Sequence, residues 1–115
     1  MALVLIADDS AVARVSVARR VRAAGIEVVE EESAAGASAV DASGLACALL
    51  DIELGDGDGT EVAERLRERR ETLPIAFFSS TRAPEILARA AAFGPVFAKP
   101  DQLDQAVDWI RKSAV

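Results

Sequence analysis

Short apolar runs alternate with longer segments of mixed polarity along the whole chain. The apolar runs have the length of strands in a covered sheet, and we predict strands at residues 3–7, 26–30, 45–50, 75–78 and 95–98. The segments between and after them have helical spacing or helix-terminating glycines, and we predict helices at residues 10–24, 34–43, 59–71, 84–92 and 101–113. Strands that alternate with such helices are typical of right-handed crossovers and a parallel sheet. The pattern predicts an α/β fold, (βα)5, doubly wound around a parallel five-stranded sheet.

The second predicted strand differs from the others because it carries the charged residues Glu27 and Glu30. A charged strand fits the edge of a sheet better than its centre. It is also the strand whose following residues, Glu31 to Ser33, have no obvious chemical role. With this strand at the edge and the first and third strands side by side, the order is 2-1-3-4-5. This is the flavodoxin-like order, and its switch point lies between the first and third strands.

The other four strands each end at a polar residue of a useful chemical type. Asp8 and Asp9 follow the first strand, Asp51 the third, Ser79 the fourth and Lys99 the fifth. Taken singly, each is more often a helix cap, a turn residue or a surface residue. Together they would meet at the carboxyl edge of one parallel sheet, where open α/β sheets bind their ligands. The sequence therefore predicts one crevice that contains three carboxylates, a hydroxyl and an ammonium.

This set of groups suits a divalent cation and a phosphoryl group. Carboxylates brought together repel one another unless a cation lies between them. The chain has no histidine and one cysteine, so oxygen ligands for Mg²⁺ or Mn²⁺ are favoured over a zinc site. Lys99 and Ser79 are suited to contacts with phosphoryl oxygens, and the Asp51 carboxylate is suited to attack phosphorus. No general base is needed for that attack, because an ionised carboxylate has no proton to lose.

The net charge bears on the expected partners, and the position of the one cysteine bears on its reactivity. The net charge of −6 argues against a nucleic-acid-binding domain. Four arginines cluster in the first predicted helix, and we interpret them as a solvated helix face: Arg14, Arg19, Arg20 and Arg22. Cys47 lies inside an apolar run, so we expect a small buried residue rather than a reactive thiol.

Length and hydropathy favour one domain without a membrane span. At 115 residues the chain is expected to form a single domain. No apolar stretch approaches the roughly 18 residues that a spanning helix needs. No basic region precedes the apolar run at the N-terminus, so we expect no signal peptide and a cytoplasmic location.

The glycine-rich segment at residues 55–59 has the sequence Gly-Asp-Gly-Asp-Gly. It lacks the spacing of a calcium-binding loop, and no lysine follows it as in a phosphate-binding loop. We interpret it as a flexible loop that leads into the third helix.

Several of these motifs occur together in one known family. They are Asp8-Asp9, Leu49-Leu50-Asp51, Asp58-Gly59, the run from Pro74 to Ser79, and Lys99-Pro100. With them the chain resembles the receiver domains of two-component response regulators over its whole length, residues 1–115. The resemblance implies a cis peptide bond between Lys99 and Pro100, which proline makes feasible.

The resemblance also implies a role for each residue of the predicted crevice. Asp51 would be the phosphoacceptor, Ser79 the switch hydroxyl and Lys99 a contact to the phosphoryl group. Mg²⁺ would bind Asp9, Asp51 and the backbone carbonyl of Glu53 directly, and Asp8 mainly through water.

The implied function is a signalling switch rather than an enzyme with a substrate of its own. A histidine kinase or a histidine phosphotransfer protein would supply the phosphoryl group, and a separate downstream protein would receive the signal. A homodimer through the fourth helix, fifth strand and fifth helix is compatible with the resemblance. No nucleic-acid or membrane partner is expected.

Three departures from the family pattern keep other interpretations open. Gly55 stands where the family often has proline, and Val96 stands where an aromatic switch residue is usual. A valine has no ring to move between two positions. Val96 and Gly55 therefore leave room for a degenerate receiver that acts only as a protein-interaction module, although the full acidic set argues against it. Glu53 lies two residues after Asp51, the offset of the general acid in aspartyl-phosphate hydrolases of the dehalogenase type.

Overall fold

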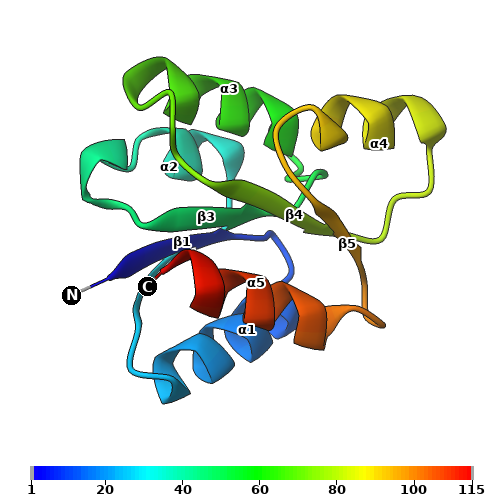
Figure 1. Ribbon diagram of the computed structural model, residues 1–115. Helices are drawn as coiled ribbons and strands as arrows, with labels where there is room; N and C mark the ends of the chain where they lie inside the picture. The colour runs from blue at the N-terminus through cyan, green and yellow to red at the C-terminus, as the bar shows by residue number, and fades with distance from the viewer. Residues whose placement is uncertain (1, 115) are drawn as a thin grey trace.

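The computed structural model describes residues 2–114, and the two terminal residues of the predicted domain lie outside them. These residues form a parallel five-stranded sheet in the order β2-β1-β3-β4-β5 (Figure 1). The strands are β1 (Leu3–Ala7), β2 (Glu27–Glu31), β3 (Cys47–Leu50), β4 (Ile75–Ser79) and β5 (Val96–Ala98). The helices are α1 (Ala11–Ala23), α2 (Ala34–Ser38), α3 (Gly59–Arg69), α4 (Pro84–Ala91) and α5 (Leu103–Ser113), with a 3₁₀ turn, η1, at Ala42–Gly44. The predicted fold class and strand order are confirmed.

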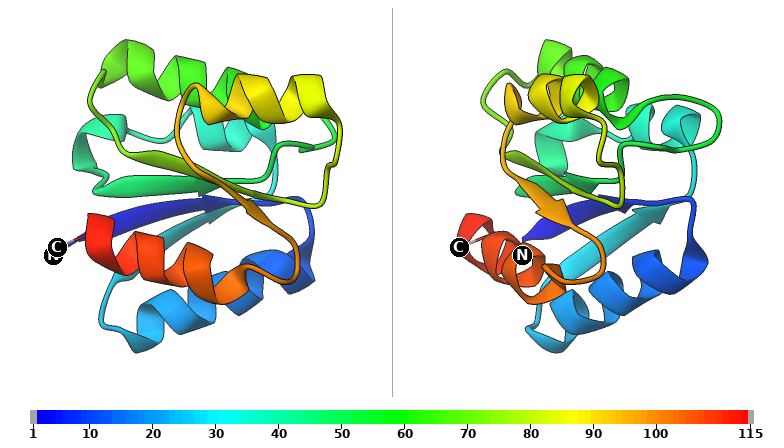
Figure 2. Two further views of the ribbon diagram at one scale, coloured as in Figure 1. Left: turned by 45° about the vertical axis from the view of Figure 1, so that its right-hand side comes forward. Right: turned by 90° about the vertical axis from the view of Figure 1, so that its right-hand side faces the viewer.

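The helices cover both faces of the sheet. The helices α1 and α5 lie on one face, and α2, α3 and α4 lie on the other (Figure 1 and Figure 2). Successive residues of β1 point to opposite faces. Leu5 therefore belongs to the same buried cluster as Leu66 of α3, whereas Ile6 belongs to the cluster that contains Val17 of α1. Two apolar cores thus hold the sheet from both sides, as a parallel sheet requires.

The central strand β3 is buried throughout, and this includes Cys47. Burial raises the pKa of the Cys47 thiol to about 12, because the charged thiolate would lose its hydration. The prediction of a buried cysteine is therefore confirmed.

The second helix is shorter than predicted. The expected helix at residues 34–43 is replaced by α2, which ends at Ser38, and by the turn η1. The Arg69 guanidinium of α3 donates hydrogen bonds to the carbonyls of Ser38 (2.7 Å) and Val40 (2.8 Å). The Asp41 carboxylate then caps η1 by accepting from the Ser43 amide at 3.0 Å. Side-chain contacts thus satisfy backbone groups that a continuous helix would have bonded internally.

The arginines of α1 do not form one solvated face. Arg19 is exposed, as predicted. Arg20 and Arg22 are also exposed, and they form ion pairs with Asp104 at 2.6 Å and with Glu30 at 2.9 Å. The interpretation is wrong for Arg14, whose side chain is only 15% exposed.

Candidate functional site

The strand ends bring the predicted site residues together at the carboxyl edge of the sheet. Asp8 follows β1, Asp51 follows β3, Ser79 ends β4 and Lys99 follows β5. One carboxylate oxygen from each of Asp8, Asp9 and Asp51 lies within 4.8 Å of the others. The Lys99 ammonium lies 2.7 Å from Asp8 Oδ2 and 3.2 Å from Asp51 Oδ2. The structure thus gathers the three carboxylates and the ammonium in one crevice.

The site is largely withdrawn from water. Asp8, Asp51 and Ser79 are buried, whereas Asp9 is exposed at the rim. Burial raises the pKa of Asp51, and the negative charge of Asp8 acts in the same direction. The Lys99 ammonium and hydrogen bonds from Lys99 and Ser79 oppose this rise. Asp51 is therefore a carboxylate that is costly to ionise and that depends on neighbouring cations.

The pKa of Lys99 is shifted by the same burial and by the neighbouring aspartates. Burial alone would lower the pKa of Lys99, but the hydrogen bonds and charges of Asp8 and Asp51 outweigh it, and the net pKa is raised. The ammonium therefore stays charged and acts as a counterion within the crevice. The peptide bond between Lys99 and Pro100 is cis, as predicted.

Backbone contacts fix the two buried aspartates. The Asp8 amide donates to the Glu31 carbonyl at 3.0 Å, and Asp8 Oδ1 accepts from the Ser10 amide at 2.9 Å. The Asp51 amide donates to the Ala7 carbonyl at 2.8 Å, which continues the pairing of β1 and β3 past the end of the strands. The two carboxylates are thus placed by the register of the sheet.

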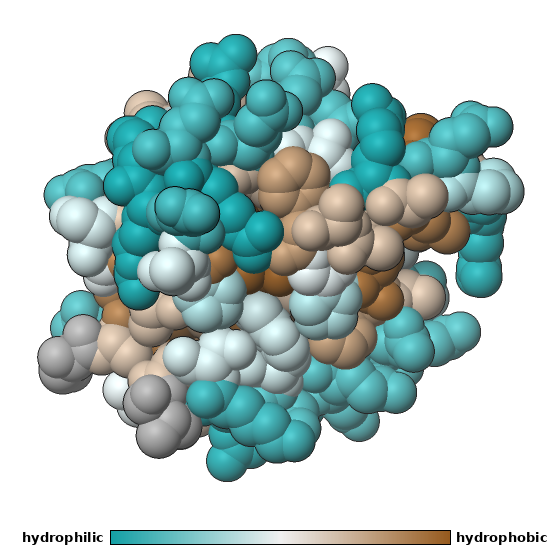
Figure 3. All heavy atoms as spheres, turned by 45° about the horizontal axis from the view of Figure 1, so that its top comes forward, coloured by the Kyte–Doolittle hydropathy of each residue, from teal (hydrophilic) through white to brown (hydrophobic). Residues whose placement is uncertain are grey.

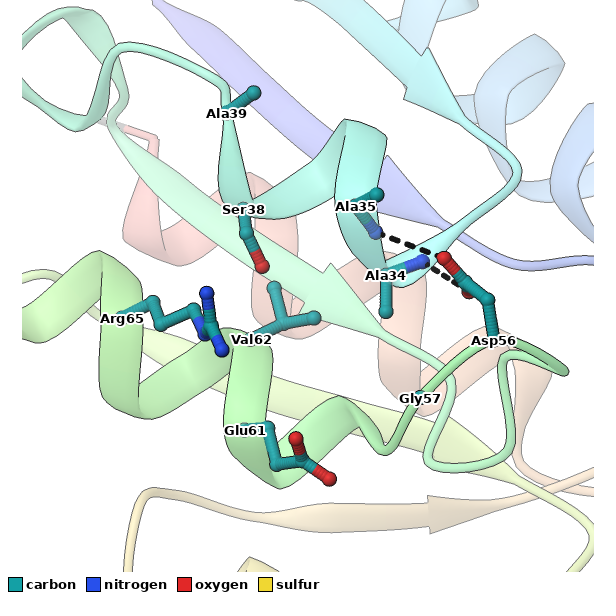
Figure 4. Close-up of a pocket in the computed structure, with 9 residues that line it drawn as sticks. All are labelled: Ala34, Ala35, Ser38, Ala39, Asp56, Gly57, Glu61, Val62 and Arg65. Atoms are coloured by element: carbon teal, nitrogen blue, oxygen red, sulfur yellow. Dashed lines mark hydrogen bonds between the residues drawn. The ribbon is translucent and has the colours of Figure 1, made fainter.

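The loop between β3 and α3 is hydrogen-bonded, so the predicted flexible loop is not what the structure shows. Glu53 and Asp58 form an isolated bridge, and Gly55 makes the turn with a φ of 74°. The Asp56 carboxylate accepts from the amides of Ala34 and Ala35, at 2.7 and 3.1 Å (Figure 4). The acidic residues of this segment serve as caps, because they bind backbone amides at the ends of helices.

One glycine of this loop is required by close packing. A Cβ at Gly59 would lie 2.0 Å from the Asp51 carbonyl oxygen, and the Gly59 amide donates to the Ile52 carbonyl at 2.7 Å. The start of α3 therefore lies directly against the backbone that carries Asp51, so any side chain at position 59 would displace that backbone.

Hollows also lie outside the acidic crevice. One, of about 420 Å³, lies between α2 and α3 and is lined by residues that include Ser38, Val62 and Arg65 (Figure 4). Another, of about 470 Å³, has Ser79, Leu87 and Val96 in its wall and adjoins the crevice through Ser79. Figure 3 shows an apolar stretch in the region of α4 and β5, beside the charged surface of α3.

The donor set fits a hard cation. The three converging side chains offer only carboxylate oxygens, and within residues 2–114 the one thiol, that of Cys47, is buried in the sheet. Mg²⁺ prefers oxygen ligands and keeps several waters, so three carboxylates at a partly open rim meet its needs. The exposure of Asp9 leaves one side of the crevice open to a ligand.

Comparison with protein families then places the chain. The family model for the response regulator receiver domain matches residues 4–112. The chain belongs to the response regulator receiver domain family. No curated protein matches the sequence of this receiver domain.

Solved structures share the fold of this receiver domain at low sequence identity. The non-phosphorylated HemR receiver domain from Leptospira biflexa is 17% identical, with a TM-score of 0.87 over 99% of this chain and 94% of that one. A CheY-like response regulator receiver domain protein from Methanospirillum hungatei is 22% identical, with a TM-score of 0.79 over 98% and 96%. A response regulator from Burkholderia pseudomallei, solved with a phosphorylated aspartic acid, a calcium ion and citrate, is 18% identical, with a TM-score of 0.78 over 99% and 69%.

Sequence reasoning missed two residues that shape the site. Arg14 donates to the Asp8 carbonyl at 2.8 Å, and Asp56 ties the loop after Asp51 to α2. Both contacts join segments that are distant in sequence or lie on different elements, and neither has a local pattern that would reveal it.

Across residues 2–114, no helix is both long enough and apolar enough to span a bilayer.

Proposed function

We propose that this receiver domain is a phosphorylatable signalling switch with Asp51 as its phosphoacceptor. The observation that carries the proposal is the convergence of Asp8, Asp9 and Lys99 on the buried Asp51 carboxylate. Membership of the receiver domain family implies such a switch. The phosphorylated aspartic acid and the calcium ion of the Burkholderia pseudomallei response regulator support the same chemistry here.

The acidic residues would hold the cation. We assign Asp9, Asp51 and the backbone carbonyl of Glu53 as direct ligands of Mg²⁺ and Asp8 as a ligand through water; Mn²⁺ is expected to substitute. When bound, Mg²⁺ neutralises charge on the phosphoryl oxygens.

Phosphoryl transfer would then use the carboxylate of Asp51 as nucleophile. A carboxylate oxygen forms a bond to phosphorus while the bond from phosphorus to the imidazole nitrogen of the donor breaks, and that nitrogen keeps the electron pair. The donor is a phosphohistidine of a kinase or of a phosphotransfer protein. Lys99 holds Asp51 ionised before transfer, so no general base is required. The domain would catalyse only this transfer and its own dephosphorylation.

The phosphorylation signal would be passed to a partner by the face formed by α4, β5 and α5. Ser79 and Lys99 are expected to contact the new phosphoryl group, and Ser79 also lines the apolar hollow beside Leu87 and Val96. Movement of the Ser79 hydroxyl toward the phosphoryl group would therefore alter the wall of this hollow. A separate downstream protein in the cytoplasm, or a second copy of the domain, would read this change.

The test is covalent labelling followed by intact mass measurement. The domain is incubated with Mg²⁺ and acetyl phosphate or phosphoramidate, and one added phosphoryl group is expected. Asp51→Asn should abolish the label, whereas Asp108→Asn, on the exposed side of α5, should keep it. No label with either donor would favour a phosphorylation-independent interaction module. Rapid turnover of a phosphomonoester would favour an aspartyl-phosphate hydrolase.

A further inference from the structure

Arg14 is a partly buried arginine whose donors are directed to particular acceptors. Its side chain is 15% exposed, whereas that of Arg22 on the same helix is 51% exposed. A guanidinium removed from water needs hydrogen-bond partners to offset the lost hydration. Nε of Arg14 donates to Glu30 Oε1 at 3.2 Å, and Nη1 donates to the backbone carbonyl of Asp8 at 2.8 Å.

The Asp8 carbonyl is part of the peptide group that joins Asp8 to Asp9. Because a peptide group is planar, a donor that holds this carbonyl also fixes the direction of the following amide. The buried Asp8 side chain has its own anchors in the Ser10 amide and the Lys99 ammonium. The exposed Asp9 depends more on the orientation of its backbone. The contact from Arg14 therefore bears on where the Asp9 carboxylate lies.

Glu30 holds the guanidinium from the other side. It lies on the edge strand β2, directly opposite Ile6 of β1 in the register of the sheet. Its second oxygen accepts from Arg22 at 2.9 Å, so both oxygens of the carboxylate are bound. A continuous set of contacts thus runs from β2 through Arg14 to the peptide between Asp8 and Asp9.

We propose that Arg14 is a positioning residue for cation binding, and that its guanidinium, held by Glu30, orients the Asp8–Asp9 peptide so that the Asp9 carboxylate faces Asp51. This inference rests on the proposed function, in which Asp9 and Asp51 bind Mg²⁺. Residues that orient metal ligands typically change the metal affinity by about 10- to 100-fold when they are replaced.

The experiment compares Arg14→Gln with Arg22→Gln, because both arginines pair with Glu30 but only Arg14 reaches the Asp8 carbonyl. Mg²⁺ is titrated into each ¹⁵N-labelled protein, and the amide shifts of Asp9 and Gly55 are followed. We expect Arg14→Gln to raise the Mg²⁺ dissociation constant by about tenfold, and Arg22→Gln to change it by less than about twofold. Labelling by acetyl phosphate should recover in Arg14→Gln when Mg²⁺ is saturating, because the nucleophile itself is intact.

Two further variants test the same inference without relying on Arg14→Gln to fold. Arg14→Lys has one point charge in place of a fork, so it cannot serve Glu30 and the Asp8 carbonyl together. Glu30→Gln weakens the hold on the guanidinium. Both should raise the dissociation constant in the same direction. In EDTA, the Asp9 amide should shift in all three variants but not in Arg22→Gln.

The possible failures are distinct. If the wild-type domain binds Mg²⁺ and the Arg14 and Glu30 variants bind it equally well, the inference is overturned but the proposed function is not. A wild-type domain that shows neither Mg²⁺-dependent shifts nor phosphorylation would overturn the proposed function, and the inference with it.

Discussion

The ammonium of Lys99 lies 2.7 Å from the carboxylate of Asp8. Its distance to the Asp51 carboxylate is longer, 3.2 Å. A positive charge thus already sits among the oxygens that are proposed to bind a cation and to accept the phosphoryl group. Lys99 serves as an internal counterion, because it offsets the repulsion between two buried carboxylates.

Replacing Lys99 with alanine should leave Mg²⁺ binding intact and make it tighter by up to about tenfold, because a competing cation is removed. Calorimetric titration with Mg²⁺ measures this change. Lys112→Ala is a matched control, since Lys112 pairs with Asp108 on the surface of α5. On phosphorylation, the wild type is expected to show changes in the NMR amide shifts of α4 and β5. Phosphorylated Lys99→Ala should lack these changes. Loss of Mg²⁺ binding in Lys99→Ala would contradict the assigned role.

Asp51→Asn should stabilise the domain at neutral pH by about 1 kcal/mol, within the range of single stabilising substitutions. The pKa of Asp51 is raised above 3.8, first by burial and then by the charge of Asp8. The folded state therefore binds the proton more tightly than the unfolded state does. Wild-type stability is then lost as the pH rises from 3.8 through the raised pKa.

The measurement is urea unfolding in EDTA over a series of pH values. The gap between Asp51→Asn and the wild type should be small at acidic pH and should grow as the pH rises. Asp108→Asn, at an exposed position, should follow the wild type throughout. A gap that stays constant with pH would show that ionisation of Asp51 is not the cause.

Gly59→Ala should cost about 3 kcal/mol of folding free energy, at the upper end of the usual range for overpacking. The new methyl group would meet the Asp51 carbonyl oxygen, 2.0 Å from the ideal Cβ position. Gly44→Ala is the control, because no heavy atom lies within 4 Å of its Cβ position. Chemical denaturation compares the two variants, and equal stabilities would refute the close approach.

Asp56→Ala should speed hydrogen exchange at the amides of Ala34 and Ala35 by about tenfold, because both lose their acceptor. These same hydrogen bonds lower the pKa of Asp56, so protection should also decline as the pH falls through that lowered pKa. Asp41→Ala, which removes a cap from η1 instead, should leave these two amides unchanged. Unaltered exchange in Asp56→Ala would show that the loop and α2 are held by other contacts.

Periodicity and strand-end chemistry were sufficient to predict the sheet, its order and the crevice. Each apolar run implies a strand, and the parallel order brings residues that follow the strands to one edge. Asp8 and Asp51 could therefore be placed from local sequence, although they are far apart along the chain. The charged residues of β2 likewise identified the edge strand.

Contacts made by long side chains were not predictable in this way. The helix α2 ends early because Arg69 binds the Ser38 and Val40 carbonyls, and no local signal at those positions indicates this. Arg14 was interpreted as a surface residue because its charge alone suggested exposure. Its burial depends on the exact placement of Glu30 and the Asp8 carbonyl, which only the folded structure provides.

The burial of Cys47 has a practical consequence for experiments on this chain. Cys47 is the sole thiol of the sequence and lies fully inside the sheet, where its pKa is raised to about 12. Maleimides and similar reagents attack the thiolate of an accessible cysteine, so the native protein should resist them. A single cysteine introduced on α4 can then carry a fluorophore or spin label in an otherwise unaltered background.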